Sequence, residues 1–186
     1  MENRNQGPLR NPFTISVVGP QQLHDISAIK NLFNDYASWL GSHGIDLTYQ
    51  SYAVELSSLP GKYVEKNGGS LLLARSTSAD QIPLGCVALR PLNPPEVAEM
   101  KRLWVAPQAR SLALGRELVN AILATAKKLG YHEVRLDTLP FMEKAQAMYQ
   151  KFGFTECEPY YDTPISGTVF LSCRISNGEE AGKSIE

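Results

Sequence analysis

VAPQARSLALGREL, residues 105–118, contains the end of a strand, a short loop and the start of a helix. Pro107 closes the largely apolar run at 97–105, and apolar residues then recur three or four apart as far as Ala126. The first amides of a helix lack partners within it and carry partial positive charge, so they are suited to bind phosphate. Arg110 and Arg116 add two full charges here. These residues alone leave a second interpretation open, an ordinary strand-to-helix turn with two solvated arginines.

Strand-like and helix-like segments alternate on both sides of this turn. Apolar runs predict strands at 13–19, 70–76, 84–92, 97–105 and 134–137, and near 154–158 and 168–175. Helical spacing predicts helices over 21–40 and 48–56, after the turn up to a cap at Gly130, and from Thr138 and Pro140 to a stop at Gly153. This order is typical of one α/β domain. We expect it to span 12–176, between flexible polar tails at 1–11 and 177–186.

The composition excludes several classes of protein. With 18 Lys and Arg against 19 Asp and Glu, the net charge is −1 and provides no basic surface for nucleic acid. No apolar run approaches the roughly 18 residues that a membrane-spanning helix needs. The start, MENRNQGPLR, lacks the apolar stretch of a secretory signal. Three widely spaced cysteines, Cys86, Cys157 and Cys173, have no zinc spacing, so we expect no metal site and a reducing, cytoplasmic setting.

Two motifs give the chain a resemblance to a known family. Val105-Ala106-Pro107 precedes the loop RSLALG at 110–115, and residues 145–154 read AQAMYQKFGF. In this order and spacing they resemble the GNAT superfamily of acyl-CoA-dependent N-acetyltransferases, in a subgroup without an assigned substrate. The resemblance implies a single GNAT-type domain with a mixed, mostly antiparallel central sheet and helices on both faces. It also implies that the sheet is splayed between the strands ending at Val105 and Asp137.

The resemblance further implies acetyl-CoA as the cosubstrate, with coenzyme A as a product. The backbone amides of the loop and first helical turn would hold the pyrophosphate, namely Arg110, Ser111, Leu112, Ala113, Leu114, Gly115 and Arg116. The pantetheine arm would run along the strand end at Leu103, Trp104 and Val105. Ser111 and Ala113 stand where the family motif has glycine. Because alanine adds one methyl group and a modest conformational cost, we expect this phosphate site to persist with altered affinity.

Proton removal from the amine needs a base, because an alkyl amine with a pKa of about 10.4 is protonated at neutral pH. The resemblance assigns this role to Glu99, six residues before Val105. Strand alternation predicts that Glu99 shares a face with Lys101, Leu103 and Val105. The alternative for Glu99 is a structural carboxylate paired with Lys101 or Arg102.

Protonation of the departing thiolate is assigned by the same resemblance to Tyr149, within residues 145–154. The alternative for Tyr149 is a core aromatic residue. Asp137 ends a strand near the same gap, and helix capping or loop bracing is favoured for it over catalysis. Arg90, Tyr160 and Tyr161 are weaker candidates for the acceptor side. We expect Trp39 and Trp104 to be packing residues.

Together these expectations describe an acetyltransferase that acts on a primary amine by direct attack. The absence of a Cys or Ser nucleophile motif agrees with a reaction that forms no acyl-enzyme. The acceptor is left open among a small metabolite, an antibiotic-like compound, a peptide N-terminus and a lysine, and the chain could be a monomer or a homodimer. The alternative is a non-catalytic module of the same fold that senses acyl-CoA or binds a partner.

Overall fold

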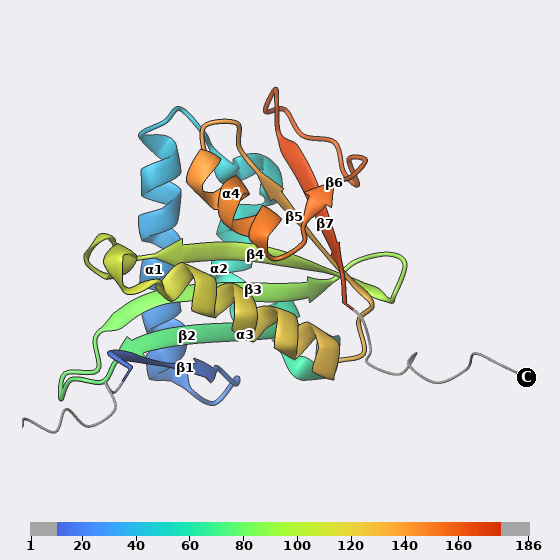
Figure 1. Cartoon of the computed structure of the whole chain (residues 1–186). Helices are drawn as coiled ribbons and strands as arrows, with labels where there is room; N and C mark the ends of the chain where they lie inside the picture. Colours follow the sequence, from blue (N-terminus) through green and yellow to red (C-terminus); the bar gives the residue numbers. More distant parts are fainter. Residues whose placement is uncertain (1–10, 176–186) are drawn as a thin grey trace, which may run out of the picture.

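The central feature of the fold is one sheet, which a computed structural model of residues 11–175 describes. Over this range, seven strands are ordered β1-β2-β3-β4-β5-β7-β6 (Figure 1). Their bounds are β1 (Phe13–Val17), β2 (Ser70–Ser76), β3 (Pro83–Pro91), β4 (Val97–Val105), β5 (Glu133–Thr138), β6 (Thr155–Glu156) and β7 (Val169–Arg174). Each neighbouring pair is antiparallel except β4 and β5, which run parallel. The expected mixed, mostly antiparallel sheet is confirmed, whereas the tails predicted at 1–11 and 177–186 lie outside the described residues apart from Asn11.

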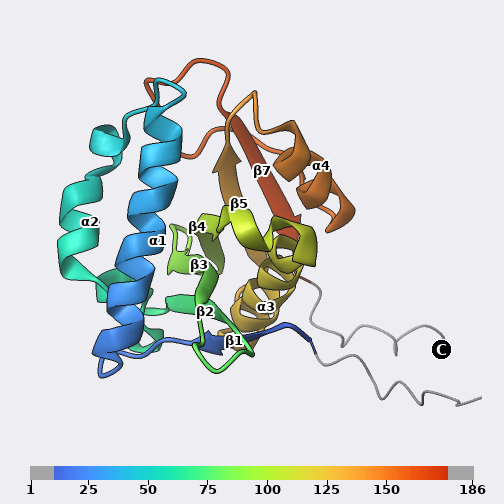
Figure 2. The same cartoon turned by 90° about the vertical axis from the view of Figure 1, so that its left-hand side faces the viewer.

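Helices cover both faces of the sheet, as expected. They are α1 (Leu23–Gly41), α2 (Tyr52–Ser58), α3 (Leu114–Lys128) and α4 (Glu143–Lys151), with short 3-10 turns η1 (Leu47–Gln50), η2 (Gly61–Tyr63), η3 (Glu65–Asn67) and η4 (Pro107–Leu112). Figure 2 shows α1 and α2 on one side of the sheet and α3 and α4 on the other. The last helix begins at Glu143 rather than at Thr138, because Thr138 is still the buried end of β5 and a turn from Leu139 to Met142 follows it.

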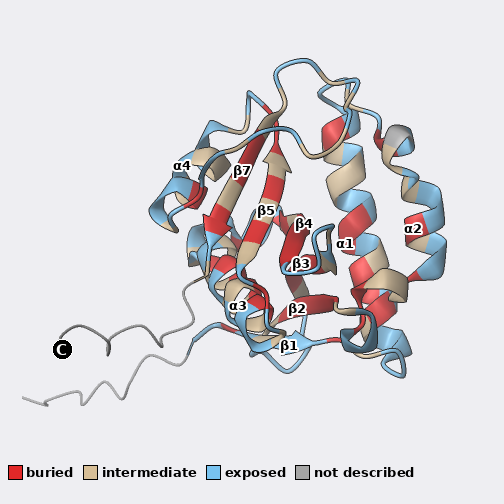
Figure 3. Ribbon diagram, turned by 90° about the vertical axis from the view of Figure 1, so that its right-hand side faces the viewer, coloured by how far each residue is buried: buried red, intermediate tan, exposed pale blue. Residues whose placement is uncertain are grey.

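Two buried clusters hold these layers together (Figure 3). In the cluster that we call the α3 core, Leu114, Leu118 and Ile122 are fully buried against one face of the sheet. In the α1 core, Ile29 and Phe33 are fully buried against the other face. Each such side chain contributes about 1.5–3 kcal/mol by leaving water. The apolar stripes of the two helices therefore fix both faces of the sheet.

The two parallel strands part soon after they meet. Backbone pairing joins β4 and β5 only from Val97 opposite Glu133 to Glu99 opposite Arg135. Beyond these residues β4 continues to Val105 and β5 to Thr138, with no pairing between them in the part of the chain that is described. The splay predicted between the strands ending at Val105 and Asp137 is confirmed.

A bulge in β4 changes which side chains share a face. Cys86 pairs with Trp104 but Ala88 pairs with Lys101, so β4 carries one extra residue between them, and Arg102 has a φ of 58°. Before the bulge Met100 points into the α3 core, and after it Leu103 and Val105 do. The prediction that Glu99 shares a face with Leu103 and Val105 is therefore wrong, because the inserted residue reverses the alternation.

A buried ion pair anchors the bulge to α2. The Arg102 guanidinium donates from Nε to Glu55 Oε1 at 2.8 Å and from Nη2 to Oε2 at 3.3 Å, and both side chains are 3% exposed. Lys62 Nζ lies 2.9 Å from Glu55 Oε2. Burial alone would raise the pKa of Glu55, but the hydrogen bonds and charges of Arg102 and Lys62 outweigh it and lower the pKa from 4.5 to about 2. The folded state thus strongly favours the ionised carboxylate.

We predict an acid-sensitive contribution of Glu55 to stability. Because its pKa is lower in the folded than in the unfolded chain, the contribution is complete above about pH 5 and is lost as the pH falls toward 2. The difference in free energy of unfolding between wild type and Glu55→Gln should shrink by about 2 kcal/mol between pH 6 and pH 3, measured by denaturant titration. The exposed Glu65→Gln serves as control and should keep the wild-type acid sensitivity. A difference for Glu55→Gln that does not vary with pH would contradict this.

Candidate active site

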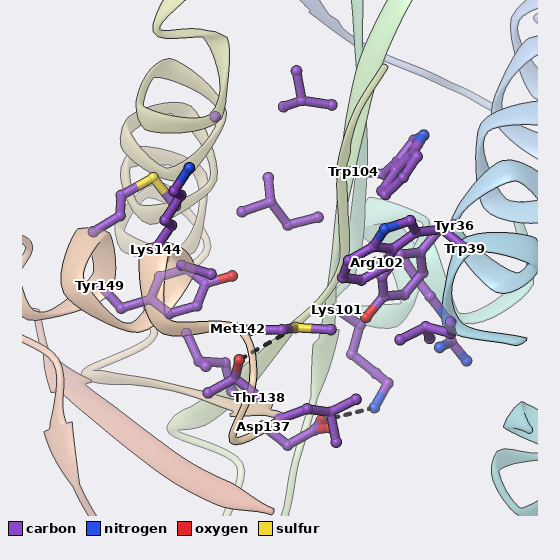
Figure 4. Close-up of a pocket in the computed structure, with 18 of the residues that line it drawn as sticks. Tyr36, Trp39, Lys101, Arg102, Trp104, Asp137, Thr138, Met142, Lys144 and Tyr149 are labelled. Carbon is purple, nitrogen blue, oxygen red and sulfur yellow. Dashed lines mark hydrogen bonds and ion pairs between the residues drawn. The ribbon is translucent and has the colours of Figure 1, made fainter. Parts of the chain in front are cut away.

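The parting of β4 and β5 leaves a cleft of about 740 Å³, which we call the β4–β5 cleft. Its walls come from α1, β4, the η4–α3 turn, β5, the segment after β5 and the first two turns of α4. Figure 4 shows Tyr149 and Lys144 of α4 on one side, and Tyr36, Trp39 and Trp104 across the cleft from them. Residues from distant parts of the sequence therefore meet where the two strands separate.

The η4–α3 turn lines one end of this cleft. Ala113 directly precedes α3 and adopts a left-handed conformation, with φ 55° and ψ 15°. The amides of Arg116 and Glu117 donate to its carbonyl at 3.0 and 3.3 Å, so the amides of Leu114 and Gly115 lie before the first helical bond. Amides at this position are the ones that an anion bound at a helix start contacts.

The predicted coenzyme residues divide by position. The turn residues that line the cleft are Arg110, Ala113, Gly115 and Arg116, and the β4 residues that line it are Leu103, Trp104 and Val105. Ser111 is exposed and Leu112 half-buried, and neither lines the cleft. The Leu114 side chain is fully buried in the α3 core. Leu112 and Leu114 could therefore contact a phosphate only through their backbone. Ser111 could do so through its backbone or from outside the cleft.

The free edge of β4 faces the same space. Since β5 has left, the backbone of Leu103 to Val105 is not part of a ladder on that side in the described structure. An unpaired strand edge presents N–H and C=O groups to any extended ligand. Arg110 Nε donates a long hydrogen bond of 3.5 Å to the Val105 carbonyl, and its guanidinium lies 5.2 Å from the Trp104 ring centre.

Tyr149 is both a packed aromatic residue and part of the cleft wall. Its side chain is 7% exposed and packs on Phe154, with ring centres 5.8 Å apart, yet it also lines the cleft. Figure 4 shows its hydroxyl directed into the cleft. Burial, with smaller contributions from Tyr36 and Asp137, raises the pKa of Tyr149 far above its usual value. The phenol therefore keeps its proton at neutral pH, and its role as an acid stays a prediction.

Glu99 is fully buried and does not line the cleft. Its Oε1 accepts from Lys101 Nζ at 3.4 Å and from the Tyr160 hydroxyl at 3.0 Å, and its Oε2 accepts a short hydrogen bond from Arg90 Nε. The structural partnership with Lys101 is thus present, while Arg102 pairs with Glu55 instead. The role of Glu99 as a base stays a prediction, and its position requires Lys101 or water to connect it with the cleft.

The weaker acceptor-side candidates lie behind the cleft wall. Arg90 and Tyr160 both contact Glu99, and Lys101 Nζ lies 5.7 Å from the Tyr161 ring centre. None of Arg90, Tyr160 and Tyr161 is among the described residues that line the cleft. They brace Glu99 and Lys101 from the side of β3 and of the segment between β6 and β7.

Asp137 lines the cleft although helix capping was favoured for it. Its side chain is 17% exposed, and its Oδ1 lies 3.3 Å from Lys101 Nζ (Figure 4). Of the two structural roles favoured for Asp137, helix capping is wrong, because α4 begins five residues after β5 ends and Met142 at its N-cap makes no side-chain cap bond. The sequence already indicated the place of Asp137 at a strand end near the gap, but not its contact with Lys101.

An aromatic wall, formed by Tyr36, Trp39, Trp104 and Phe141, was not predicted; of these four residues only Trp104 was expected at the site, through its backbone. All four line the cleft, and the ring centres of Trp39 lie 5.8 Å from Trp104 and 5.9 Å from Phe141. Trp39 and Trp104 do pack, as expected, but they also face the cleft. The spacing of Tyr36 and Trp39 along one face of α1, with His43 just beyond its end, is the sequence signal that could have indicated it.

The described residues contain neither a candidate membrane-spanning helix nor a candidate metal site. Within 11–175, no helix has both the length and the apolar character needed to cross a membrane. Over the same span, no group of three or more His, Cys, Asp and Glu side chains is arranged to hold a metal ion.

Comparison of the sequence with known proteins finds N-acetyltransferases. The model of the acetyltransferase (GNAT) family matches residues 27–154. An uncharacterized N-acetyltransferase of Schizosaccharomyces pombe is 38% identical over 165 residues, which cover 89% of this chain and 98% of the relative. An uncharacterized N-acetyltransferase of Dictyostelium discoideum is 29% identical, over 81% of this chain and 94% of the relative.

Solved structures share the fold at lower identity. A putative acyl-CoA N-acyltransferase from Klebsiella pneumoniae superposes with a TM-score of 0.65 at 23% identity, covering 87% of this chain and 97% of that one. The ribosomal-protein-S18-alanine N-acetyltransferase from Escherichia coli superposes with a TM-score of 0.61 at 19% identity, covering 94% and 99%. At this identity the likeness concerns the fold.

The left-handed conformation of Ala113 makes a prediction about stability. Holding an L-residue in this conformation destabilises the fold by about 1–2 kcal/mol, and glycine avoids most of that strain. Glycine in turn destabilises the fold by roughly 0.5–1 kcal/mol, because its unfolded chain has more conformational entropy than that of alanine. Ala113→Gly should therefore raise the free energy of unfolding by about 0.5 kcal/mol in denaturant titration. The matched change Ala147→Gly, at an exposed position within α4, should lower it by about 1 kcal/mol. Equal losses for both variants would show that Ala113 is not held in the left-handed region.

Proposed function

Because the chain belongs to the acetyltransferase (GNAT) family, we propose that the β4–β5 cleft transfers an acetyl group from acetyl-CoA to a primary amine by direct attack. One observation carries this proposal: a helix start, a free strand edge and a protonated phenol line a single cleft. The helix start would bind a diphosphate, the strand edge would hold an extended arm, and the phenol would stabilise a leaving thiolate.

The residues present fit the coenzyme. Arg110 and Arg116 bring two cations to the turn, and the amides of Leu114 and Gly115 have no earlier helical partner. A Cβ added at Gly115 would lie 3.7 Å from Met148 Sδ and from Val105 Cγ2, so glycine keeps open the space between the helix start and the end of β4. The backbone of Leu103 to Val105 would bind the pantetheine arm by hydrogen bonds, as an added strand would.

Acetyl-CoA supplies an activated thioester, so that the amine nitrogen gains the acyl group as the carbon–sulfur bond breaks. Tyr149 would donate a hydrogen bond to the departing sulfur. Under ordinary conditions a phenol is less acidic than a thiol by about 1.5 pKa units, and burial increases the pKa of Tyr149 further. The proton therefore passes late, from a strong hydrogen bond, rather than by prior ionisation.

The carboxylates have different access to the amine. Asp137 lines the cleft and Glu99 does not, and Lys101 lies between them at 3.3 Å from the first and 3.4 Å from the second. We assign first contact with the amine to Asp137, and to Glu99 an indirect part through the position of Lys101. A carboxylate in this cleft can accept a proton from an incoming ammonium directly or through water.

The coenzyme assignment predicts an effect of Gly115→Ala. In the free protein the added methyl group meets only ordinary contacts, and alanine favours a helix, so thermal stability should be unchanged or slightly higher. A methyl group pressed against the diphosphate should raise the Kd for coenzyme A at least about tenfold in titration calorimetry. The control is Gly41→Ala at the end of α1, where an added Cβ meets nothing within 4 Å, and its Kd should equal that of wild type. Unchanged affinity of Gly115→Ala would place the diphosphate elsewhere.

The acid assignment predicts that Tyr149→Phe lowers kcat about 100-fold while the affinity for acetyl-CoA stays within about twofold. The measurement is release of coenzyme A thiol over a panel of amines. Tyr131→Phe is the control, because the Tyr131 hydroxyl donates to the Gly68 carbonyl at 2.6 Å away from the cleft. It should lower the melting temperature and leave kcat unchanged. Binding of acetyl-CoA without thiol release from any amine would favour the non-catalytic acyl-CoA-binding module instead.

A further inference from the structure

The β4–β5 cleft holds surface that the transfer of an acetyl group does not by itself require. In the aromatic wall, Tyr36, Trp39 and Trp104 lie across the cleft from α4 (Figure 4), and the Phe141 ring is 5.9 Å from that of Trp39. Tyr36 and Trp39 are half-buried, and Phe141 is 43% exposed. Phe141 also stacks on His43, with ring centres 4.9 Å apart and planes within 3° of each other. Flat apolar side chains gathered at a cleft are suited to contact a flat apolar ligand.

The aromatic wall is rigidly built. Tyr36 and Trp39 are one helical turn apart and nearly parallel, at 19°, and Trp104 approaches them to 5.7 and 5.8 Å between ring centres. Tyr36 and Trp39 also pack against the buried Leu40, Leu47 and Leu139, which line the same cleft. Packing of the rings on one another lowers the entropy that they lose when a ligand binds.

The charges around the cleft do not suit an acceptor with several amino groups. Among the described residues that line it, the cations are Lys101, Arg102, Arg110, Arg116 and Lys144, and the anions are Asp137 and Glu143. Glu143 is exposed at the start of α4, whereas Asp137 is half-buried at the end of β5. A polyamine would place its second charge near Lys101, where the repulsion is unfavourable, whereas the charge of Arg102 is matched by Glu55. One carboxylate, that of Asp137, remains for one amino group.

Asp137 is the carboxylate that can receive that amino group. Lys101 Nζ is 3.3 Å from Oδ1, which is longer than a strong charge-assisted bond. Asp137 and Tyr149 line the same cleft (Figure 4). The Asp137 charge also contributes, after burial and Tyr36, to the raised pKa of Tyr149. The amine site and the leaving-group site therefore belong to one cleft.

We infer that the acceptor is a small primary monoamine carrying an aromatic ring, which the aromatic wall binds while Asp137 holds the amino group. This inference rests on the proposed function. The bound ammonium loses one proton to the Asp137 carboxylate, and the neutral nitrogen then attacks the thioester carbonyl. As the amide forms, the nitrogen loses its second proton. Tyr149 gives a proton to the leaving thiolate and is reprotonated by that second proton. The products are the N-acetyl amine, coenzyme A and one proton released from Asp137 to water.

The first test compares four acceptors, scored by thiol release from acetyl-CoA: 2-phenylethylamine, ethylamine, spermidine and a short peptide with a free N-terminus. We expect the aromatic amine, 2-phenylethylamine, to exceed each of the others in kcat/KM by at least about tenfold. Trp39→Ala should reduce the ratio between 2-phenylethylamine and ethylamine toward one, while Leu23→Ala, at the exposed start of the same helix, should keep it.

The outcomes separate the two proposals. Equal or better use of ethylamine, spermidine or the peptide would overturn the acceptor class and leave the acetyl transfer standing. Bound acetyl-CoA, seen by calorimetry, with no thiol release from any of the four amines would overturn the transfer and this inference together. If the kcat/KM ratio between 2-phenylethylamine and ethylamine in Trp39→Ala equals that of wild type, the role of the aromatic wall is overturned as well.

The second test addresses Asp137 by its pH profile with 2-phenylethylamine. Asp137→Asn should lower kcat/KM about 100-fold near pH 7.5 and recover part of it toward pH 9.5, where more of the amine is already neutral. The other titratable groups that face Asp137 are Lys101 of β4, Tyr149 of α4 and Tyr160 from the segment between β6 and β7. A merely structural loss would lower the rate equally at both pH values. Activity within threefold of wild type, with a parallel profile, would remove Asp137 from this role.

Discussion

The separation of β4 from β5 after Glu99 is the constraint on which the rest of the site depends. Three residue pairs hold the strands together, and both then continue without a partner on that side in the described structure. The open edge of β4, the η4–α3 turn and the phenol of Tyr149 meet only because the sheet opens there. A continuous sheet would satisfy the same backbone groups and would leave no cleft.

Buried charge surrounds this opening. On one side Glu55 binds the bulged Arg102, and on the other Glu99 binds Arg90 and Lys101. Isolated charges in such an interior would be strongly unfavourable, and each of these carboxylates is matched by more than one donor. The two groups connect β4 to α2, to β3 and to the segment between β6 and β7. They thereby fix the strand that carries the cleft.

Most of the fold followed from the sequence, since apolar periodicity located the strands and the longer helices. The bulge at Arg102 did not, because an arginine with positive φ carries no turn signal, and alternation then misplaced Glu99. The aromatic wall joins residues 36, 39, 104 and 141, and the contact between Lys101 and Asp137 spans 36 positions. Such juxtapositions arise from the packing of distant elements, so no local pattern predicts them. The motif residues around the turn and Tyr149 were recognisable because they are contiguous.

The two walls of the cleft belong to different secondary structure elements. The turn suited to the coenzyme precedes α3 on one face of the sheet, whereas Tyr36 and Trp39 belong to α1 on the other. Under the proposed function, substitutions on α1 would change the surface that meets the acceptor and leave the residues of the turn that would bind the coenzyme as they are. A scaffold divided in this way would allow new acceptor specificities to evolve on an unchanged coenzyme site.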